Sequence, residues 1–305
     1  MHESTCHFLQ FSDLSKKEVK NIFTRAKILK ADLKKGNEQQ SMSGKVLVMI
    51  FEKHSTRTRL SFEIGMKQLG GKTSVIQGRD TQIDRGESLE DAANVISRMC
   101  DGIMIRTFEH AKLQKFADNS VVPVINGLTN EHHPCQVLSD IYTFVERKGD
   151  ISGKICSWIG DINNMCFSWI QAAKLLDFEL RISCPPEYKN LLVDSDLESP
   201  NVTFFENPIA ACEEANIITT DVWTSMGFEA EQNQRNKTFQ AWRVDADKIK
   251  VAREDVLFMH CLPAHRGDEV SSDVIDGPNS VVFEEAENRL HVQKALLEQI
   301  LVNKD

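Results

Sequence analysis

Nine short apolar runs alternate with stretches of helical periodicity in this chain, and this alternation limits its fold more than any other feature. Each run has the length of one strand, and helical patterns lie between most of them. The runs are residues 46–51, 73–76, 102–106, 121–125, 154–160, 179–184, 202–205, 217–220 and 256–260. Because alternating strands and helices form parallel sheets, the sequence predicts an α/β fold and disfavours a β-sandwich.

The runs fall into two series, which predict two domains, each a parallel sheet flanked by helices. A chain of 305 residues is long enough for two separate cores. Ser15 and Glu18 form a capping box that predicts an opening helix. A helix that begins near Pro134 and ends at Lys148 precedes the second series and is predicted to be a hinge. The last helix, 285–301, could cap the second domain or return to the first, and the pattern leaves both open.

Charge and hydropathy argue against two classes of partner. A formal net charge of -9 at pH 7 would repel a polyanion, so we expect no binding of nucleic acid. No run of eighteen apolar residues is present, and the N-terminus lacks a signal-peptide pattern, so we expect no membrane association and a cytoplasmic location. The eight cysteines include no CxxC pair, which favours free thiols.

The segment Ser55-Thr-Arg-Thr-Arg59 lies between the first apolar run and a helix-periodic stretch. A helix start offers unpaired backbone N–H groups, and hydroxyl and guanidinium side chains add further donors at the same point. This combination predicts a binding site for a phosphate group. A simpler interpretation stays open, because Ser or Thr before a helix is often only an N-cap and an Arg in the first turn is often solvated.

Further polar side chains stand where predicted strands end, which is where ligands collect in parallel sheets. Arg106 ends the run 102–106, where it needs an anion or a carboxylate partner, and both interpretations remain open. His133 and Gln136 flank Pro134 at a predicted helix start, from which both could donate to an oxygen.

The strands of the second series are followed by amide, acidic and thiol side chains. Gly160-Asp-Ile-Asn-Asn164 follows a strand and opens a helix, where the amides suit a small zwitterion unless one asparagine is an N-cap. Asp221 could bind an ammonium group or belong to a plain turn. Cys261 follows the last run, although a buried cysteine is usually inert. The irregular stretch 223–236 is predicted to be a mobile surface loop.

A metal centre and a nucleotide cofactor are both disfavoured. His132, His133, His260 and Cys261 lack the i, i+3 or CxxC spacing typical of zinc ligands. The turn that begins at Gly160 lacks the GxGxxG glycines that admit a dinucleotide. We therefore expect chemistry without a metal or a cofactor.

Four motifs, in order along the chain, resemble those of the ornithine carbamoyltransferases within the aspartate/ornithine carbamoyltransferase family. They are Ser55-Thr-Arg-Thr-Arg59, His133-Pro-Cys-Gln136, Asp221-Val-Trp-Thr-Ser-Met-Gly227 and His260-Cys-Leu-Pro263. The first two are shared by the wider family, whereas the last two point to ornithine. The resemblance covers nearly the full length, and Cys135 occupies a position that varies in the family.

The resemblance implies two α/β domains joined by hinge helices. Residues 1–133 would bind carbamoyl phosphate, with a C-terminal helix at 286–305 packing back on them, and residues 134–285 would bind ornithine. The active form would be a homotrimer or a multiple of trimers, in which Gln82 reaches the carbamoyl phosphate of a neighbouring subunit. No cofactor is implied.

The resemblance also implies a mechanism and a site. The δ-amine of L-ornithine would attack the carbamoyl carbon of carbamoyl phosphate and release L-citrulline and phosphate, as a step of arginine biosynthesis. Residues implied to bind carbamoyl phosphate are Ser55, Thr56, Arg57, Thr58, Gln82, Arg106, His133, Gln136, Cys261, Leu262 and Arg289. Residues implied to bind ornithine are Asn164, Asp221, Ser225 and Met226, and those implied to be catalytic are Arg57, Arg106, His133 and Cys261.

Within this implied site, Arg57, Thr58, His133 and Gln136 would polarise the carbamoyl carbonyl. Asp221 and Cys261 would orient the δ-amine.

Three alternative functions remain open. They are a sister carbamoyltransferase acting on aspartate, N-acetylornithine or putrescine, a dinucleotide-binding oxidoreductase, and a catalytically silent binding protein. An aspartate enzyme would need extra cationic groups for a second carboxylate, which the acidic Asp221 disfavours.

Overall fold

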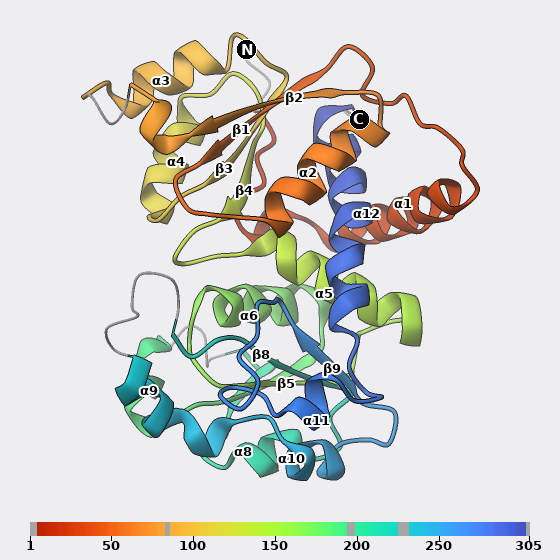
Figure 1. The fold of residues 1–305 in the computed structure, drawn as a ribbon, viewed down its shortest axis with the longest axis vertical. Coiled ribbons are helices and arrows are strands. Elements are labelled where there is room, and N and C mark those ends of the chain that lie inside the picture. Colours follow the sequence, from red (N-terminus) through yellow and green to blue (C-terminus); the bar gives the residue numbers. More distant parts are fainter. Residues whose placement is uncertain (1–4, 83–85, 194–198, 225–231, 303–305) are drawn as a thin grey trace. The chain divides into compact units, whose positions relative to one another are not determined.

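The computed structural model of the chain describes residues 5–82, 86–193, 199–224 and 232–302. The chain divides into two compact units, which are Met1–Tyr142 with Glu287–Asp305 (unit 1) and Thr143–Ala286 (unit 2) (Figure 1). The division falls inside helix α5 (Pro134–Lys148) and inside helix α12 (Val282–Leu301). The terminal residues that follow Ala286 therefore belong to unit 1, which is one of the two arrangements that the sequence left open.

Unit 1 is built on a sheet of four parallel strands in the order β2-β1-β3-β4. Its strands are β1 (Val46–Phe51), β2 (Lys72–Gln77), β3 (Gly102–Arg106) and β4 (Val124–Leu128). Its helices, besides its parts of α5 and α12, are η1 (Phe11–Asp13), α1 (Lys16–Lys34), α2 (Arg57–Gln68), η2 (Gly78–Asp80), α3 (Leu89–Ile96) and α4 (His110–Asp118). The capping box of α1 forms as predicted, because Ser15 accepts from the backbone of Glu18 and the Glu18 side chain accepts from that of Ser15.

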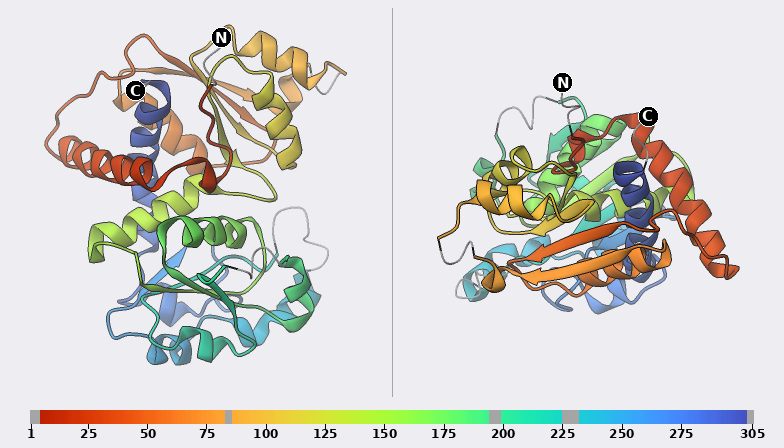
Figure 2. Two further views of the ribbon diagram at one scale, coloured as in Figure 1. Left: turned by 180° about the vertical axis from the view of Figure 1, so that it is seen from behind. Right: turned by 90° about the horizontal axis from the view of Figure 1, so that it is seen from above.

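Both faces of this sheet are covered. Val48 and Ile103 on one face join a core with residues of α3 and α4, such as Ala93 and Phe116. In Figures 1 and 2, α3 and α4 lie on one side of the strands, and α1 and α2 lie on the other. Strands buried on both faces are expected to be nearly continuous apolar runs, which explains why 46–51 has no alternating polar positions.

Unit 2 is built on a sheet of five parallel strands in the order β7-β6-β5-β8-β9. Its strands are β5 (Ile155–Ile159), β6 (Glu179–Ser183), β7 (Val202–Phe204), β8 (Ile217–Thr220) and β9 (Leu257–His260). Its helices, besides its parts of α5 and α12, are α6 (Asn164–Leu176), η4 (Pro186–Leu191), α8 (Pro208–Cys212), α9 (Gln232–Phe239), η6 (Gln240–Trp242), α10 (Ala246–Val251) and α11 (Ser272–Ile275). In Figure 1, α6 lies on one side of these strands, and α8, α10 and α11 lie on the other.

The order of the strands in unit 2 determines where polar groups can meet. The strand order changes direction at β5, because β6 and β7 lie on one side of β5 and β8 and β9 lie on the other. Ligands in such sheets bind at the carboxyl ends of the strands beside this point. The ends of β5, β8 and β9 are followed by Gly160, Asp221 and Cys261, so the topology collects the three polar segments at one edge.

The fold class is confirmed by these two sheets, and each of the nine predicted strands has a counterpart. The prediction for residues 121–125 is wrong in position, because β4 begins at Val124 and continues to Leu128. Pro123 has no N–H to donate to a ladder, and Val121 is half exposed, so the strand starts only after the proline.

The predicted loop at 223–236 is also wrong in part, since α9 begins at Gln232. Residues 225–231 of that stretch lie outside the described residues. The helix has almost no apolar periodicity, but Phe239 at its end is buried against Tyr188 and Trp223, and Arg235 adds further contacts. The guanidinium of Arg235 lies over the rings of Tyr188 and Phe239 and pairs with Asp161 at 2.6 Å. The contacts of Arg235 with Tyr188 and Asp161 join distant parts of the sequence, so a local pattern does not show them.

All eight cysteines are free thiols, as predicted. Among the described residues, no helix combines the length and the apolar character that a membrane span requires.

Candidate active site

A positively charged candidate site lies in unit 1, where the ends of two neighbouring strands bring its residues together. β1 and β3 pair so that Phe51 lies opposite Arg106. The chain that leaves β1 turns into α2 at Arg57, so the end of β3 and the start of α2 are close. The order of the strands thereby joins the segment 55–58 to a residue some fifty positions away.

Thr58 is the centre of this cluster. Its side-chain oxygen accepts a hydrogen bond from Arg289 Nη2 at 2.7 Å and another from Arg106 Nη1 at 3.4 Å. All three residues are buried, with 1% of Thr58, 2% of Arg289 and 7% of Arg106 exposed. Two buried guanidinium groups on one hydroxyl concentrate positive charge, which is stable when an anion compensates it.

His133 lies in the field of the same charges. Burial lowers the pKa of His133 well below its usual 6.5, and the charges of Arg289, Arg106 and Arg57 lower it further. Only cations near the imidazole can act in this way, so Arg57 belongs to the cluster as well. The neutral form of His133 is therefore favoured at pH 7, and in that form one ring nitrogen carries an N–H that can donate a hydrogen bond.

The remaining residues predicted for unit 1 are placed less centrally. Ser55 and Thr56 precede α2, and Thr56 is its N-cap residue but makes no side-chain capping bond. The N-cap interpretation therefore does not account for Thr56. Gln136 is buried on the first turn of α5 and donates to Asp140 at 2.7 Å. Gln82 is exposed beyond η2.

α12 supplies Arg289, and α1 holds this helix in place. Lys30 of α1 is buried and donates to the side chain of Asn288 at 2.7 Å, one residue from Arg289. Further along α12, Glu298 accepts from Arg25 Nη2 at 2.9 Å. Contacts from helix α1 to α12 therefore help to hold Arg289 in position.

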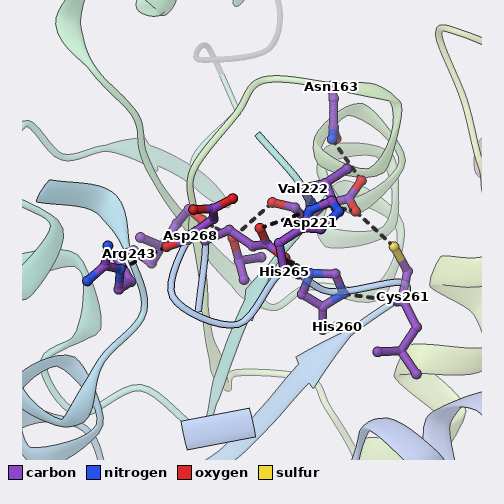
Figure 3. A network of polar contacts seen from close by, with 12 residues as sticks. Asn163, Asp221, Val222, Arg243, His260, Cys261, His265 and Asp268 are labelled. Atoms are coloured by element: carbon purple, nitrogen blue, oxygen red, sulfur yellow. Dashed lines mark hydrogen bonds and ion pairs between the residues drawn. The ribbon is translucent and has the colours of Figure 1, made fainter. Parts of the chain in front are cut away.

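Unit 2 holds a second cluster, of opposite character, centred on Asp221 (Figure 3). One carboxylate oxygen of Asp221 accepts from Asn163 Nδ2 at 2.9 Å, and the other lies 3.1 Å from the Cys261 sulfur. That second oxygen also accepts from the N–H of Val222 at 2.8 Å. Asp221 is 8% exposed, whereas Cys261 and Asn163 are half-buried. An acid, an amide and a thiol thus meet at the ends of β5, β8 and β9, as the topology requires.

His260 fixes the backbone beside this thiol. The imidazole lies within hydrogen-bond distance of Glu269 at 3.2 Å through Nε2, and Nδ1 accepts from the N–H of Leu262 at 2.9 Å. Burial alone would raise the pKa of Glu269, but the hydrogen bonds and charge of His260 outweigh it, and the net pKa is lowered. Leu262 has a φ of 56°, a conformation that few L-residues adopt, and its N–H bond to His260 holds it there.

A second acid lies near Asp221. Burial raises the pKa of Asp161 to about 6, although Arg235 opposes this shift, and the charge of Asp221 adds to it. Arg235 also donates through Nε to the carbonyl of Trp223. It therefore ties the turn after β5 to the turn after β8.

Asp221, His260 and Cys261 could each offer one ligand atom to a cation, and these atoms lie within 4.8 Å of one another. Both ring nitrogens of His260 already have hydrogen-bond partners, so a metal would have to displace one of them. Chemistry without a metal remains a prediction.

The structure separates two neighbours that the sequence could not. Asn163 is the N-cap of α6, because its side chain accepts from Met165 and Cys166, and it also contacts Asp221. Asn164 is the first helical residue and is half-buried. Ser225 and Met226 were also predicted to bind ornithine, and both lie outside the described residues.

Sequence reasoning missed three residues that support the two clusters, namely Asn163 as a partner of Asp221, Glu269 and Asp140. Asp140 and Glu269 are buried, at 1% and 0% exposure, and each contacts a predicted site residue or its neighbour. One signal was available for Asp140, since it lies among the apolar positions of α5. Glu269 follows a Gly-Asp pair typical of an exposed turn, so no signal distinguished it.

Comparison with known proteins connects both units to one family. Residues 6–146 match the carbamoyl-P binding domain of aspartate/ornithine carbamoyltransferase, and residues 152–300 match the Asp/Orn binding domain. Ornithine carbamoyltransferase from Azoarcus sp. is 56% identical over 299 residues, which is 98% of this chain and 96% of that protein.

Solved structures agree with this. Ornithine carbamoyltransferase from Burkholderia thailandensis has a TM-score of 0.90 and 52% identity, over 97% of this chain and 99% of the other. The enzyme from Pyrococcus furiosus has a TM-score of 0.94 and 40% identity, with both chains covered completely. The chain therefore belongs to the aspartate/ornithine carbamoyltransferase family and is a carbamoyltransferase.

Proposed function

We propose that this enzyme is an ornithine carbamoyltransferase, which converts carbamoyl phosphate and L-ornithine to L-citrulline and phosphate. The observation that carries the proposal is the buried cationic cluster around Thr58 in the unit that matches a carbamoyl-P binding domain. The relatives compared above are named as ornithine carbamoyltransferases, which supports ornithine as the second substrate.

The phosphate of carbamoyl phosphate would be held by the residues at the ends of β1 and β3. Ser55, Thr56, Arg57 and Thr58 supply hydroxyl, guanidinium and helix N-terminal donors, and Arg106 and Arg289 add charge. A phosphate carries close to two negative charges, and paired guanidinium donors match its geometry. The buried positive charge of the cluster would then be compensated by the substrate.

The carbamoyl group would be activated by the same cluster. Arg57, Thr58 and His133 would donate to the carbonyl oxygen, on which negative charge grows as the tetrahedral intermediate forms. A neutral His133 suits this role because its single N–H can donate to the oxygen and is not lost as a proton near pH 7. Arg106 and Arg289 would stabilise the phosphate as it leaves.

The amino acid would be bound by unit 2. Asp221 is a buried acid whose neighbours are an amide and a thiol, which suits an amine or ammonium group. Asn164, Ser225 and Met226 would hold the α-amino and α-carboxylate end of ornithine, while Asp221 and Cys261 orient its δ-amine. The backbone carbonyl of Leu262 would accept from a substrate N–H.

Cys261 acts in this proposal as a hydrogen-bonding group and forms no covalent bond to the carbamoyl carbon. The neutral δ-amine is itself the nucleophile, so the reaction needs no acyl-enzyme intermediate. Mass spectrometry of the enzyme quenched during turnover should find Cys261 unmodified. A carbamoylated Cys261 that forms and decays at the rate of turnover would refute this role.

Three further assignments belong to the same proposal. The enzyme would act in arginine biosynthesis, and a relative from Campylobacter jejuni that is 39% identical is named an anabolic ornithine carbamoyltransferase. The free thiols suit a reducing cytoplasm. The active form would be a homotrimer or a multiple of it, with Gln82 reaching a neighbouring subunit, and light scattering would give the mass.

A citrulline assay tests the proposed function directly. The purified enzyme is given carbamoyl phosphate with ornithine, aspartate or putrescine in parallel, and each carbamoylated product is measured. Ornithine should be favoured in kcat/KM by at least about a hundredfold, because Asp221 would repel a second carboxylate and the α-groups of ornithine have partners that putrescine lacks. A comparable rate with aspartate or putrescine would contradict the proposal.

A further inference from the structure

Glu52 follows strand β1 directly, in the middle of the unit 1 sheet, and contacts the segment that follows each neighbouring strand. The sheet order β2-β1-β3 places the ends of β2 and β3 on either side of it. Gly78 follows β2, and a Cβ atom there would lie 2.9 Å from Cγ of Glu52, so the two segments are packed closely. Thr107 follows β3, and its hydroxyl donates to the Glu52 carboxylate. Glu52 therefore joins the ends of three strands.

Two contacts from Glu52 hold the peptide unit between Arg106 and Thr107. The N–H of Glu52 donates to the carbonyl of Arg106 at 2.9 Å, and the Glu52 carboxylate accepts from the hydroxyl of Thr107. On the opposite side, the N–H of Thr107 donates to the carbonyl of Leu128 at 3.0 Å. Thr107 is 1% exposed, so water does not readily replace Glu52 as the partner of its hydroxyl. The backbone from which the Arg106 side chain starts is thus held from both neighbouring strands.

Lys112 of α4 determines which way the Glu52 carboxylate faces. Lys112 Nζ donates to Oε1 at 2.7 Å, and the hydroxyl of Thr107 donates to Oε2, so each carboxylate oxygen has its own donor. A carboxylate with a separate donor on each oxygen is more precisely oriented than one with a single partner. The lysine also compensates a negative charge that would otherwise weaken the binding of an anion at the neighbouring cluster.

The position of this backbone matters because Arg106 carries its charge at the end of a long side chain. A small rotation of the backbone moves the guanidinium through a larger distance. A misplacement of about 1 Å can cost about a hundredfold in rate when the group acts on the reacting atoms. In the proposed function, Arg106 stabilises the phosphate as it leaves, so the accuracy of that contact depends on the backbone that Glu52 and Thr107 hold.

We propose that Glu52 is a positioning residue for carbamoyl phosphate, which acts through Thr107 on the backbone of Arg106 and is itself oriented by Lys112. Glu52 makes no contact with the substrate in this role. The inference rests on the proposed function, because it assumes that Arg106 contacts the phosphate of carbamoyl phosphate.

Thr107→Val tests the contact with the least change, because valine has the shape of threonine without the hydroxyl. At saturating ornithine, kcat/KM for carbamoyl phosphate should fall by about tenfold, whereas the KM for ornithine should change by less than about twofold. Phosphonoacetamide is an unreactive analogue in which a methylene group replaces the bridging oxygen of carbamoyl phosphate. Calorimetry should show its dissociation constant raised by about fivefold. Thr107→Ser keeps the hydroxyl and should stay within about twofold of the wild type in each measurement.

Ser120→Ala is the matched control for the lost hydroxyl. Ser120 is buried before β4 at the opposite, amino-terminal edge of the same sheet, and its hydroxyl donates to the carbonyl of Val122 at 2.7 Å. The variant should lower the urea midpoint of unfolding about as much as Thr107→Val does. It should nevertheless leave the kinetic constants for both substrates within about twofold of the wild type.

Glu52→Leu tests the same contact from its other side, whether or not Thr107→Val folds. It should lower kcat/KM for carbamoyl phosphate by at least about tenfold, and adding Thr107→Val to it should change this value by less than about twofold, because the two side chains act as one unit. Asp101→Leu is its control at the amino-terminal edge, where Asp101 accepts from the N–H of Val46 at 2.8 Å and pairs with Lys45 at 3.7 Å. This change should leave the kinetic constants within about twofold of the wild type.

The inference is overturned if Thr107→Val keeps the wild-type kcat/KM for carbamoyl phosphate, or if Thr107→Ser loses as much as Thr107→Val. It is also overturned if the KM for ornithine rises as much as the affinity for phosphonoacetamide falls, or if either control variant shows the same loss. Citrulline formation by the wild type is measured on the same preparations. An enzyme that makes citrulline but shows one of these results refutes the role of Glu52 alone. An enzyme that makes no citrulline refutes the proposed function, and the inference with it.

Discussion

The clusters of unit 1 and unit 2 differ in charge, in burial and in the way they are supported. In unit 1, two guanidinium groups meet on Thr58, and each residue is less than a tenth exposed. In unit 2, Asp221 meets a half-buried amide and a half-buried thiol. The residues around Thr58 form a buried cationic cluster, whereas the acidic cluster around Asp221 includes partly exposed side chains.

This difference matches the demands of two unlike substrates. A phosphate is recognised by buried positive charge. Bringing such charges together costs free energy, so their positions must be held rigidly, here by the ends of β1 and β3 and by α12. An amine has to lose its proton before it can attack, so its site should hold it with hydrogen bonds while leaving a path to water. We infer that unit 1 supplies most of the transition-state stabilisation, while unit 2 supplies most of the specificity for the acceptor.

The largest expected effect is the loss of one cation from unit 1. Arg57→Ala removes charge-assisted hydrogen bonds to phosphate and to the carbonyl oxygen, so kcat/KM for carbamoyl phosphate should fall by about 10³ or more. Arg59→Ala is the matched control, since Arg59 is exposed and pairs only weakly with Glu63 at 3.5 Å, and it should change the rate by less than about twofold. Steady-state kinetics of both variants would measure this kcat/KM. Near-normal turnover in Arg57→Ala would remove Arg57 from the site.

The corresponding change in unit 2 should be smaller and should affect the other substrate. Asp221→Asn keeps the shape of the side chain but removes the charge, so kcat/KM for ornithine should fall by about 10²-fold, while binding of phosphonoacetamide changes by less than about threefold. Asp276→Asn is the control, because Asp276 pairs with Arg266 at 2.6 Å on the surface and should be almost silent. A phosphonate affinity that falls as much as the ornithine rate would contradict the division of roles.

Acid should affect the two units with opposite sign. Burial lowers the pKa of His132 to about 4, so the unfolded chain binds this proton more readily, and stability falls as the pH drops from 6.5 toward 4. Burial raises the pKa of Asp161 to about 6, so the folded chain binds this proton more readily, and stability rises as the pH drops from 6 toward 3.8. Each contribution amounts to about 1.4 kcal/mol per pH unit inside its window.

Urea unfolding at pH 7 and pH 5 checks these signs. His132→Asn should lose about 2 kcal/mol less than the wild type between the two pH values, and Asp161→Asn should lose about 1 kcal/mol more. Only the pH dependence is compared, since Asp161→Asn also weakens the pair with Arg235 at every pH. If both variants changed the pH dependence in the same direction, the assigned protonation states would be wrong.

The smallest effect compares two N-caps, one in each unit. Ser15 caps α1, and Asn163 caps α6. Each change to Ala should lower the free energy of unfolding by about 1 kcal/mol. Only Asn163→Ala should also raise the KM for ornithine, by about fivefold, because Asn163 donates to Asp221 as well. Equal kinetic effects of both variants would show that Asn163 is a cap and nothing more.

The sequence predicted most of the fold because its strands are buried on both faces. Runs such as 46–51, 102–106 and 217–220 are buried along their whole length apart from Val46, so their ends mark the ends of β1, β3 and β8. The errors arose where local chemistry decided the boundary. Pro123 delays the start of β4, and Arg235 stabilises α9 through contacts with Tyr188 and Asp161, which are far away in the sequence.

Site residues at strand ends could be predicted for the same reason, since Arg106 ends a buried strand and Asp221 and Cys261 each follow one directly. The residues that hold them could not. Glu269 supports the segment after β9 through His260, and Asp140 accepts a hydrogen bond from Gln136, but neither stands at a strand end. A supporting contact depends on which side chains face each other in three dimensions, which a linear pattern does not encode.

A crystal structure with N-(phosphonoacetyl)-L-ornithine bound tests the central claim most directly, because this compound joins the carbamoyl and ornithine ends in one molecule. We expect its phosphonate within hydrogen-bond distance of Arg57, Thr58 and Arg106, its α-carboxylate on Asn164, and its α-amino group on Asn164 or Asp221. A phosphonate bound away from Thr58, or an amino-acid end that contacts neither Asn164 nor Asp221, would contradict it.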